Sequence, residues 1–138
     1  MKIIQVVGSS NSGKTTFIKN LIPELKKLGN VAVIKHLGHH TYHITEGKDT
    51  TLFFEAGADI SIGIDSDKAV VTMHKNTLED IFDMLFDQGI EFAVVEGFKS
   101  RSFPKIVIGS LPAENCILSN PTVLEVITSL SLFENFHR

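Results

Sequence analysis

Residues 8–15 read GSSNSGKT, which matches the pattern G-x-x-x-x-G-K-[ST] of a phosphate-binding loop. Gly8 and Gly13 allow backbone conformations that bring N–H groups close to phosphate oxygens. Lys14 supplies a flexible cation for the β- and γ-phosphates, and the Thr15 hydroxyl is a ligand for Mg²⁺. The segment therefore predicts a site for a nucleoside triphosphate with magnesium.

The elements beside this loop are those that phosphate binding requires. Residues 2–7 are apolar and β-branched, as in a buried strand, and residues 15–28 have apolar side chains at helical spacing. The start of the helix adds unpaired N–H donors and the positive end of a dipole. Pro23 lies inside the helical pattern and is expected to kink the helix or to start a new segment.

Two acidic residues are candidates for the metal side of the site. Glu96 follows the apolar run 93–95, at the carboxyl end of an expected buried strand, where ligand crevices of open sheets lie. The alternative for Glu96 is a solvated carboxylate that pairs with Lys99. Asp49 is the second candidate, because its loop begins just after the second strand, and the alternative there is a plain helix cap.

Histidines and cations gather after two of the expected strands. Four histidines form the spacing His-x-x-His-His-x-x-His, and such a set either binds Zn²⁺ or Ni²⁺ or makes polar surface or substrate contacts: His36, His39, His40 and His43. Lys35 and His36, at the tip of the second strand, are expected to face the nucleotide crevice. A second basic group follows Glu96 and indicates either another anionic ligand or partner, or simple surface solvation: Lys99, Arg101 and Lys105.

Strand and helix patterns alternate along the whole chain. Further strands are expected at residues 31–34, 59–64, 68–73, 92–95, 105–108 and 116–118. Further helices are expected after Asp49, after Asn76 or Thr77, and after Pro121, with a polar loop over residues 35–48. This order predicts an α/β fold of the P-loop NTPase type, with three layers, a mostly parallel sheet and helices on both faces. One domain over residues 1–138 is expected.

Composition restricts the class of protein. The chain has 138 residues, 43% of them hydrophobic, and a formal net charge of -3, so there is no basic excess for nucleic acid. No apolar stretch approaches the ~18 residues of a membrane span. The single cysteine, Cys116, excludes an internal disulfide and suits a reducing cytoplasm. A cytoplasmic protein that acts on neither nucleic acid nor membrane is expected.

Five segments in this order resemble the molybdopterin-guanine dinucleotide biosynthesis protein B (MobB) family. They match its motifs N-S-G-K-T-T, K-H-x-x-H, G-K-D-[ST] with A-G-A, E-G-F-K and P-K-I, and they lie at residues 8–16, 33–39, 47–58, 95–99 and 104–106. Each motif is weak apart from the phosphate loop, and the order and spacing of all five make the resemblance specific. It extends from residue 3 to about residue 108.

The resemblance implies a GTP-binding, weakly hydrolysing accessory protein, usually a homodimer, that acts beside the guanylyltransferase joining GMP to molybdopterin. The implied nucleotide site consists of Gly8, Asn11, Ser12, Gly13, Lys14, Thr15 and Thr16. Thr15, Asp49 and Glu96 are the implied Mg²⁺ ligands. Candidates for contacting nucleotide or molybdopterin phosphate are Lys35, His36, Lys99 and Lys105.

Two other functions and the choice of base stay open at this stage. The guanine signature Asn-Lys-x-Asp is absent, so ATP is not excluded. The histidine segment is compatible with a metal-delivery GTPase of the nickel type. A small-molecule kinase on the same fold would need an arginine-rich lid, and the chain has two arginines, Arg101 and Arg138. The apolar strands at 60–64 and 70–73 are expected to pair across a two-fold axis in a homodimer.

Overall fold

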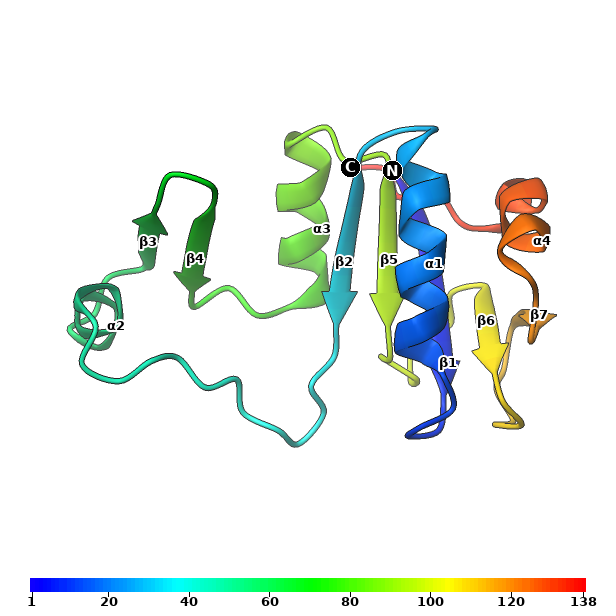
Figure 1. Ribbon diagram of the computed structural model, residues 1–138, viewed down its shortest axis with the longest axis horizontal. Coiled ribbons are helices and arrows are strands. Elements are labelled where there is room, and N and C mark those ends of the chain that lie inside the picture. Colours follow the sequence, from blue (N-terminus) through cyan, green and yellow to red (C-terminus); the bar gives the residue numbers. More distant parts are fainter. The chain divides into compact units, whose positions relative to one another are not determined.

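The computed structural model describes residues 1–138, which form two compact units (Figure 1). The core unit comprises Met1–His36 and Phe82–Arg138, and the inserted unit comprises Leu37–Ile81. No helix is long and apolar enough to cross a membrane. The organisation of the whole chain as one nucleotide-binding domain stays a prediction.

A five-stranded parallel sheet forms the centre of the core unit. Its strands are β1 (Lys2–Gly8), β2 (Val31–Lys35), β5 (Phe92–Glu96), β6 (Lys105–Ile108) and β7 (Cys116–Ser119). The order across the sheet is β2-β5-β1-β6-β7, and every neighbouring pair is parallel. Because parallel strands all run in one direction, their carboxyl ends lie on the same side of the sheet. The loops after β1, β2, β5, β6 and β7 begin on this side, where such sheets bind ligands.

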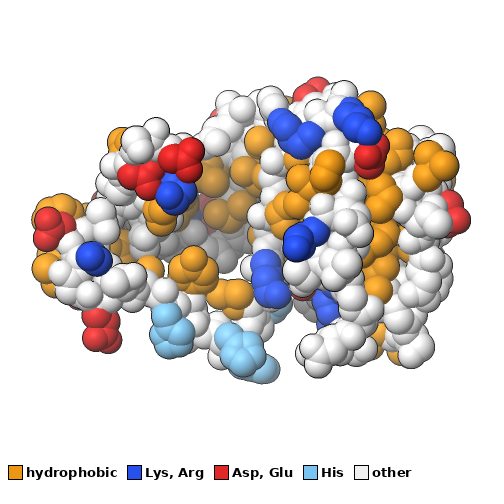
Figure 2. All heavy atoms as spheres, in the orientation of Figure 1, with side chains coloured by type: hydrophobic (Ala, Val, Ile, Leu, Met, Phe, Trp, Pro, Cys, Tyr) orange, Lys and Arg blue, Asp and Glu red, His pale blue; other side chains and the backbone are white.

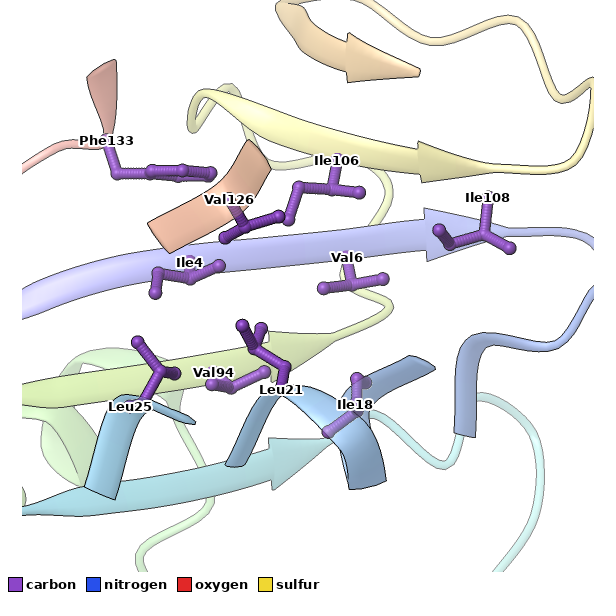
Figure 3. Packing of buried hydrophobic residues seen from close by; sticks show 10 residues of the cluster. All are labelled: Ile4, Val6, Ile18, Leu21, Leu25, Val94, Ile106, Ile108, Val126 and Phe133. Carbon is purple, nitrogen blue, oxygen red and sulfur yellow. The ribbon is translucent and has the colours of Figure 1, made fainter. Parts of the chain in front are cut away.

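Helices cover both faces of this sheet, as expected. On one face, α1 (Lys14–Lys26) and α4 (Val123–Thr128) pack against the strands (Figure 3). Leu21 and Leu25 of α1 are fully buried there, and each contributes about 1.5–3 kcal/mol of burial free energy. On the opposite face, Phe82 of α3 (Leu78–Asp87) is 3% exposed and contacts the rings of Phe103 and Phe136. A short 3₁₀ helix, η1 (Leu130–Leu132), precedes the C-terminal segment.

The inserted unit holds a helix and a two-stranded antiparallel hairpin. These are α2 (Asp49–Glu55), β3 (Ile60–Ile64) and β4 (Ala69–Met73). The turn of the hairpin is closed by Asp65, whose carboxylate accepts hydrogen bonds from the ammonium of Lys68 and from the backbone N–H groups of Asp67 and Lys68, each at 2.8 Å. These bonds, that of the Lys68 ammonium first, lower the pKa of Asp65. Ser61 Oγ fastens β3 to α2 by donating to the Thr50 carbonyl at 2.7 Å.

Two local expectations are confirmed. Residues 35–48 contain only one residue of regular structure, Lys35, the last residue of β2. Thr77 caps α3, because its hydroxyl oxygen accepts a hydrogen bond from the N–H of Asp80 at 3.1 Å.

Pro23 does not start a new segment, because the helix is continuous from Lys14 to Lys26. Pro23 is exposed in the last turns of this helix, where the carbonyl that it leaves unpaired can bond to water. Three further local expectations are wrong. Asp49 is the first helical residue of α2 rather than its cap, which is Lys48. The last helix begins at Val123 behind a Thr122 cap, later than Pro121. The apolar run at residues 31–34 predicts a buried strand, but β2 is only partly buried, with Val33 45% exposed, because it is an edge strand of the sheet.

Candidate phosphate-binding site

The loop between β1 and α1 has the backbone shape of an anion cradle. Asn11 and Gly13 have positive φ angles of 59° and 95° and alternate with residues of ordinary conformation. Such alternation turns successive N–H groups toward one side, where they can bond to an oxyanion. The N–H of Ser12 is bonded to the Ser9 carbonyl at 3.2 Å, which closes the loop on itself.

The first glycine of the loop lies against the end of β6. A Cβ atom at Gly8 would lie 2.4 Å from the carbonyl oxygen of Ile108 and 2.7 Å from Ser12 Oγ. No side chain fits there, so the loop can pack tightly on the sheet edge only with glycine at this position. Gly109, the residue after Ile108, makes two hydrogen bonds to the Asn120 side chain. Asn120 Oδ1 accepts from the Gly109 N–H at 2.7 Å, and Asn120 Nδ2 donates to the Gly109 carbonyl at 2.9 Å.

Ser12 carries a polar atom that the protein leaves unsatisfied. Its Oγ is buried and has no hydrogen-bond partner in the chain. Buried hydroxyls nearly always find a partner, so this atom is suited to a bound phosphate oxygen or a water in the loop. The residues present therefore fit a phosphate group at this loop.

The ammonium of Lys14 lies over the same loop. Lys14 Nζ donates to the carbonyl oxygens of Gly8 at 2.9 Å and Ser9 at 2.8 Å. The two bonds hold the positive charge beside the cradle of N–H groups. This is where a phosphate chain would need its counter-charge.

The first turn of α1 offers further groups for phosphate and metal. Thr15 and Thr16 are both exposed, and the first turn contains no acidic residue. Gly13 at the N-cap has no side chain to bond the free N–H groups, so these donors and the positive dipole end stay available. The Thr15 side chain is accessible from the loop surface.

Glu96 lies at the end of β5, on the sheet edge that carries the loop. The strand register pairs it with Val6, two residues before Gly8, and with Lys35 of β2. Its carboxylate is 12% exposed and lies 3.3 Å from the Lys35 ammonium. The alternative partner considered from the sequence, Lys99, is thus not the partner of Glu96. A carboxylate and a hydroxyl are the kinds of ligand that Mg²⁺ takes beside phosphates, so Glu96 and Thr15 fit this role.

Asp49 lies in the inserted unit, at the start of α2. Its role as a second metal ligand stays a prediction.

The segment after Glu96 is held in a strained conformation by two residues that sequence reasoning missed. Phe98 has φ of 53°, which is costly for a residue with a side chain, and its ring stacks on His36 with centroids 4.4 Å apart. Gln5, buried in the centre of β1, donates from Nε2 to the carbonyls of Gly97 and Phe98, both at 2.8 Å. Its position as the one amide in an apolar strand was the signal that could have identified it.

The second basic group is not a simple solvated surface. Lys105 is 2% exposed, and its ammonium donates to the Arg101 carbonyl at 2.6 Å. Surface solvation therefore does not describe Lys105, whereas Lys99 is exposed.

The histidine segment is divided between the two units. His36 belongs to the core unit, and His39, His40 and His43 are exposed residues of the inserted unit. Histidine side chains are visible at the surface in Figure 2. No group of three or more histidine, cysteine, aspartate or glutamate side chains is arranged to hold a metal ion.

The parallel sheet with helices on both faces, and the cradle that follows its central strand, define an α/β protein of P-loop-like fold. A family model described as Molybdopterin guanine dinucleotide synthesis protein B (MobB) matches residues 3–129. The chain belongs to this family.

Relatives and solved structures agree with this assignment. The chain is 31% identical to a probable molybdopterin-guanine dinucleotide biosynthesis adapter protein of Bacillus subtilis, over 99% of this chain and 76% of that protein. It is 36% identical to the molybdopterin-guanine dinucleotide biosynthesis adapter protein of Haemophilus influenzae, over 77% of this chain and 62% of that protein. A crystal structure of Bacillus subtilis MobB superposes with a TM-score of 0.75 at 27% identity, over 99% of this chain and 100% of that one.

Proposed function

We propose that this chain is a GTP-binding adapter protein of molybdopterin guanine dinucleotide biosynthesis, which assists a guanylyltransferase in attaching GMP to molybdopterin in the cytoplasm. Its family and the names of its Bacillus and Haemophilus relatives support the adapter role. The observation that carries the nucleotide part is the cradle of residues 8–15, with the Lys14 ammonium over it and the unsatisfied Ser12 hydroxyl within it.

Each group of the site has a definite task in this proposal. The loop N–H groups and the start of α1 bind the phosphate chain, and Lys14 neutralises its charge. Thr15 and Glu96 hold Mg²⁺, and the metal neutralises charge between the phosphates. The Lys35 ammonium lies 3.3 Å from Glu96, which supports a further role in this proposal: Lys35 and the adjacent His36 contact a phosphate at the same end of the sheet.

Hydrolysis of the bound nucleotide is expected to be slow. The carboxylate of Glu96 is assigned to Mg²⁺ in this proposal, and the guanidinium of Arg138 is paired with Asp87 through a hydrogen bond of 2.6 Å. Without a free base for water and an arginine aimed at the γ-phosphate, phosphoryl transfer lacks its main accelerating groups. A binder with weak turnover follows, rather than a fast GTPase.

The adapter role is tested by reconstituting the attachment of GMP. Molybdopterin guanylyltransferase is assayed for dinucleotide formation with and without this chain, in the presence of GTP and Mg²⁺. The expected result is a higher yield with the native chain, and no such gain with the Lys14→Ala variant. An identical yield in all three reactions would remove the adapter role, whatever the chain's affinity for GTP.

A homodimer through the hairpin of the inserted unit is the second part of the proposal. One face of the hairpin presents apolar side chains to solvent, with Ile60, Ile62 and Ile64 exposed by 52%, 54% and 81% and Val71 by 48%. Hydrophobic side chains reach the surface in this part of the molecule (Figure 2). A two-stranded hairpin is marginally stable alone, and an apolar patch of this kind marks an interface, so a second copy is the expected cover.

The dimer is tested by Ile62→Lys, which places a charge in the middle of this face. Sedimentation at micromolar concentration is expected to give a dimer for the native chain and a monomer for the variant, because an unpaired charge buried in the interface costs several kcal/mol. The matched control is Leu124→Lys on α4, an apolar residue 70% exposed in the core unit, which should leave the dimer intact. A native chain that sediments as a monomer would refute the dimer.

A further inference from the structure

A cavity of about 270 Å³ opens in the core unit, away from the phosphate loop's own residues. Its walls are Val7, Lys105, residues 99–102 of the loop before β6 and residues 111–114 of the loop before β7. Val6 packs into the cluster under α1, so alternation along β1 places Val7 on the opposite face of the sheet. The cavity is therefore on the face that does not carry α1.

The two loops that enclose the cavity are tied to each other. The backbone N–H of Lys105 donates to the carbonyl of Asn115 at 3.0 Å, and the Asn115 side chain donates to the carbonyl of Ser102. Asn115 itself has a positive φ of 60°, which turns the second loop back toward the first. Hydrogen bonds between the two loops therefore stabilise the walls of the cavity.

The charge of the walls favours an anion. Lys105 is 2% exposed, and its ammonium bonds to the Arg101 carbonyl, which leaves its other N–H donors for a ligand or water. A buried ammonium is costly unless a negative group compensates it. Lys99 is a second lysine on the walls, and the exposed Glu114 is the one acidic residue among them.

The remaining walls indicate that the anion is attached to an organic group. Val7, Leu111, Pro112 and Ala113 form an apolar side, and the hydroxyls of Ser100 and Ser102 are available for hydrogen bonds. A volume of 270 Å³ is near the lower limit of small-molecule sites, which suits a monophosphate better than a nucleoside triphosphate.

We propose that this cavity binds the phosphate monoester of a small organic molecule. Lys105 and Lys99 contact the phosphate, and the apolar residues Leu111 to Ala113 contact the organic part. None of the loop residues 8–15 lines this cavity, so we expect that both sites can be occupied together. Molybdopterin, whose phosphate accepts GMP in the proposed function, belongs to this ligand class. Only the choice of molybdopterin as the ligand rests on the proposed function.

The test uses the Lys14→Ala chain, in which the phosphate loop is disabled. Phenyl phosphate and inorganic phosphate are titrated into it by calorimetry. Phenyl phosphate is expected to bind at one site and more tightly than inorganic phosphate. Adding Lys99→Ala is expected to weaken phenyl phosphate about tenfold, since it removes a charge-assisted bond. Adding Lys19→Ala, an exposed lysine on α1, should change nothing.

A second variant, Lys105→Met, keeps the length of the buried side chain without its charge, and its melting temperature shows whether the fold survives. Absence of saturable phenyl phosphate binding would overturn the proposal. So would binding that neither lysine variant weakens, or inorganic phosphate binding as tightly as phenyl phosphate. GTP titration of the native chain is a separate test. Phenyl phosphate binding without GTP binding would support this site and contradict the proposed nucleotide function.

Discussion

The Lys14→Ala chain is expected to bind GTP with Mg²⁺ about 100-fold more weakly than the native chain, with an unchanged fold. The lost ammonium would otherwise make charge-assisted bonds to two phosphates, worth about 1.5–3 kcal/mol each, and about 2.7 kcal/mol corresponds to a factor of 100. In the protein itself Lys14 bonds only to the carbonyls of Gly8 and Ser9, so its removal leaves no buried charge. Calorimetric titration measures the affinity, and thermal denaturation checks the fold.

The matched control for this variant is Lys19→Ala, more than one helical turn further along α1. Lys19 is exposed and lies outside the loop, so the same loss of charge should leave the GTP affinity within about twofold of the native value. Equal affinity of the native and Lys14→Ala chains would place the nucleotide elsewhere and contradict the proposed site.

The Gly8→Ala chain is expected to lose stability as well as nucleotide binding. Its new methyl group would lie 2.4 Å from the Ile108 carbonyl oxygen, so the loop or the end of β6 must shift. Overpacking of this kind costs about 1–3 kcal/mol, which lowers the melting temperature by about 3–10 °C. The displaced loop no longer presents its N–H groups to phosphate, so GTP affinity should fall together with stability.

Gly63→Ala in β3 is the comparison for this variant. Gly63 does not have a positive φ, and the nearest atom to its new methyl group is a flexible methyl of Thr50 at 3.3 Å. Its expected cost is below about 1 kcal/mol, and GTP affinity should be unchanged. If Gly8→Ala were no more harmful than Gly63→Ala, the close approach of the loop to β6 would not be the reason for glycine at this position.

Local patterns in the sequence were sufficient for the phosphate loop and for most strands. The loop's residue types act through backbone geometry and short-range contacts, so the eight-residue pattern already contains its chemistry. The strands of the central sheet follow from apolar runs. The hairpin of the inserted unit follows from alternation of apolar residues around the turn at Asp65.

Features that depend on residues distant in the sequence but close in space could not be predicted from local sequence patterns. Strand β2 is nearly as apolar as β5, and only the strand order makes β2 an edge strand and β5 an interior strand. Gln5 acts on Gly97 and Phe98, more than 90 residues away along the chain. Lys105 was predicted either to contact an anion or to be solvated at the surface. Lysine is rarely buried, and the loop carbonyl that accepts a hydrogen bond from Lys105 is apparent only in the fold.

The measurement that tests the central claim most directly is calorimetric titration of the native chain with non-hydrolysable GTP and ATP analogues, each with and without Mg²⁺. The account predicts one site per chain, tighter binding of the GTP analogue, and weaker binding of both analogues when Mg²⁺ is removed. Equal or tighter binding of the ATP analogue would contradict the link to guanine dinucleotide chemistry, and absence of binding by either analogue would contradict the nucleotide site itself.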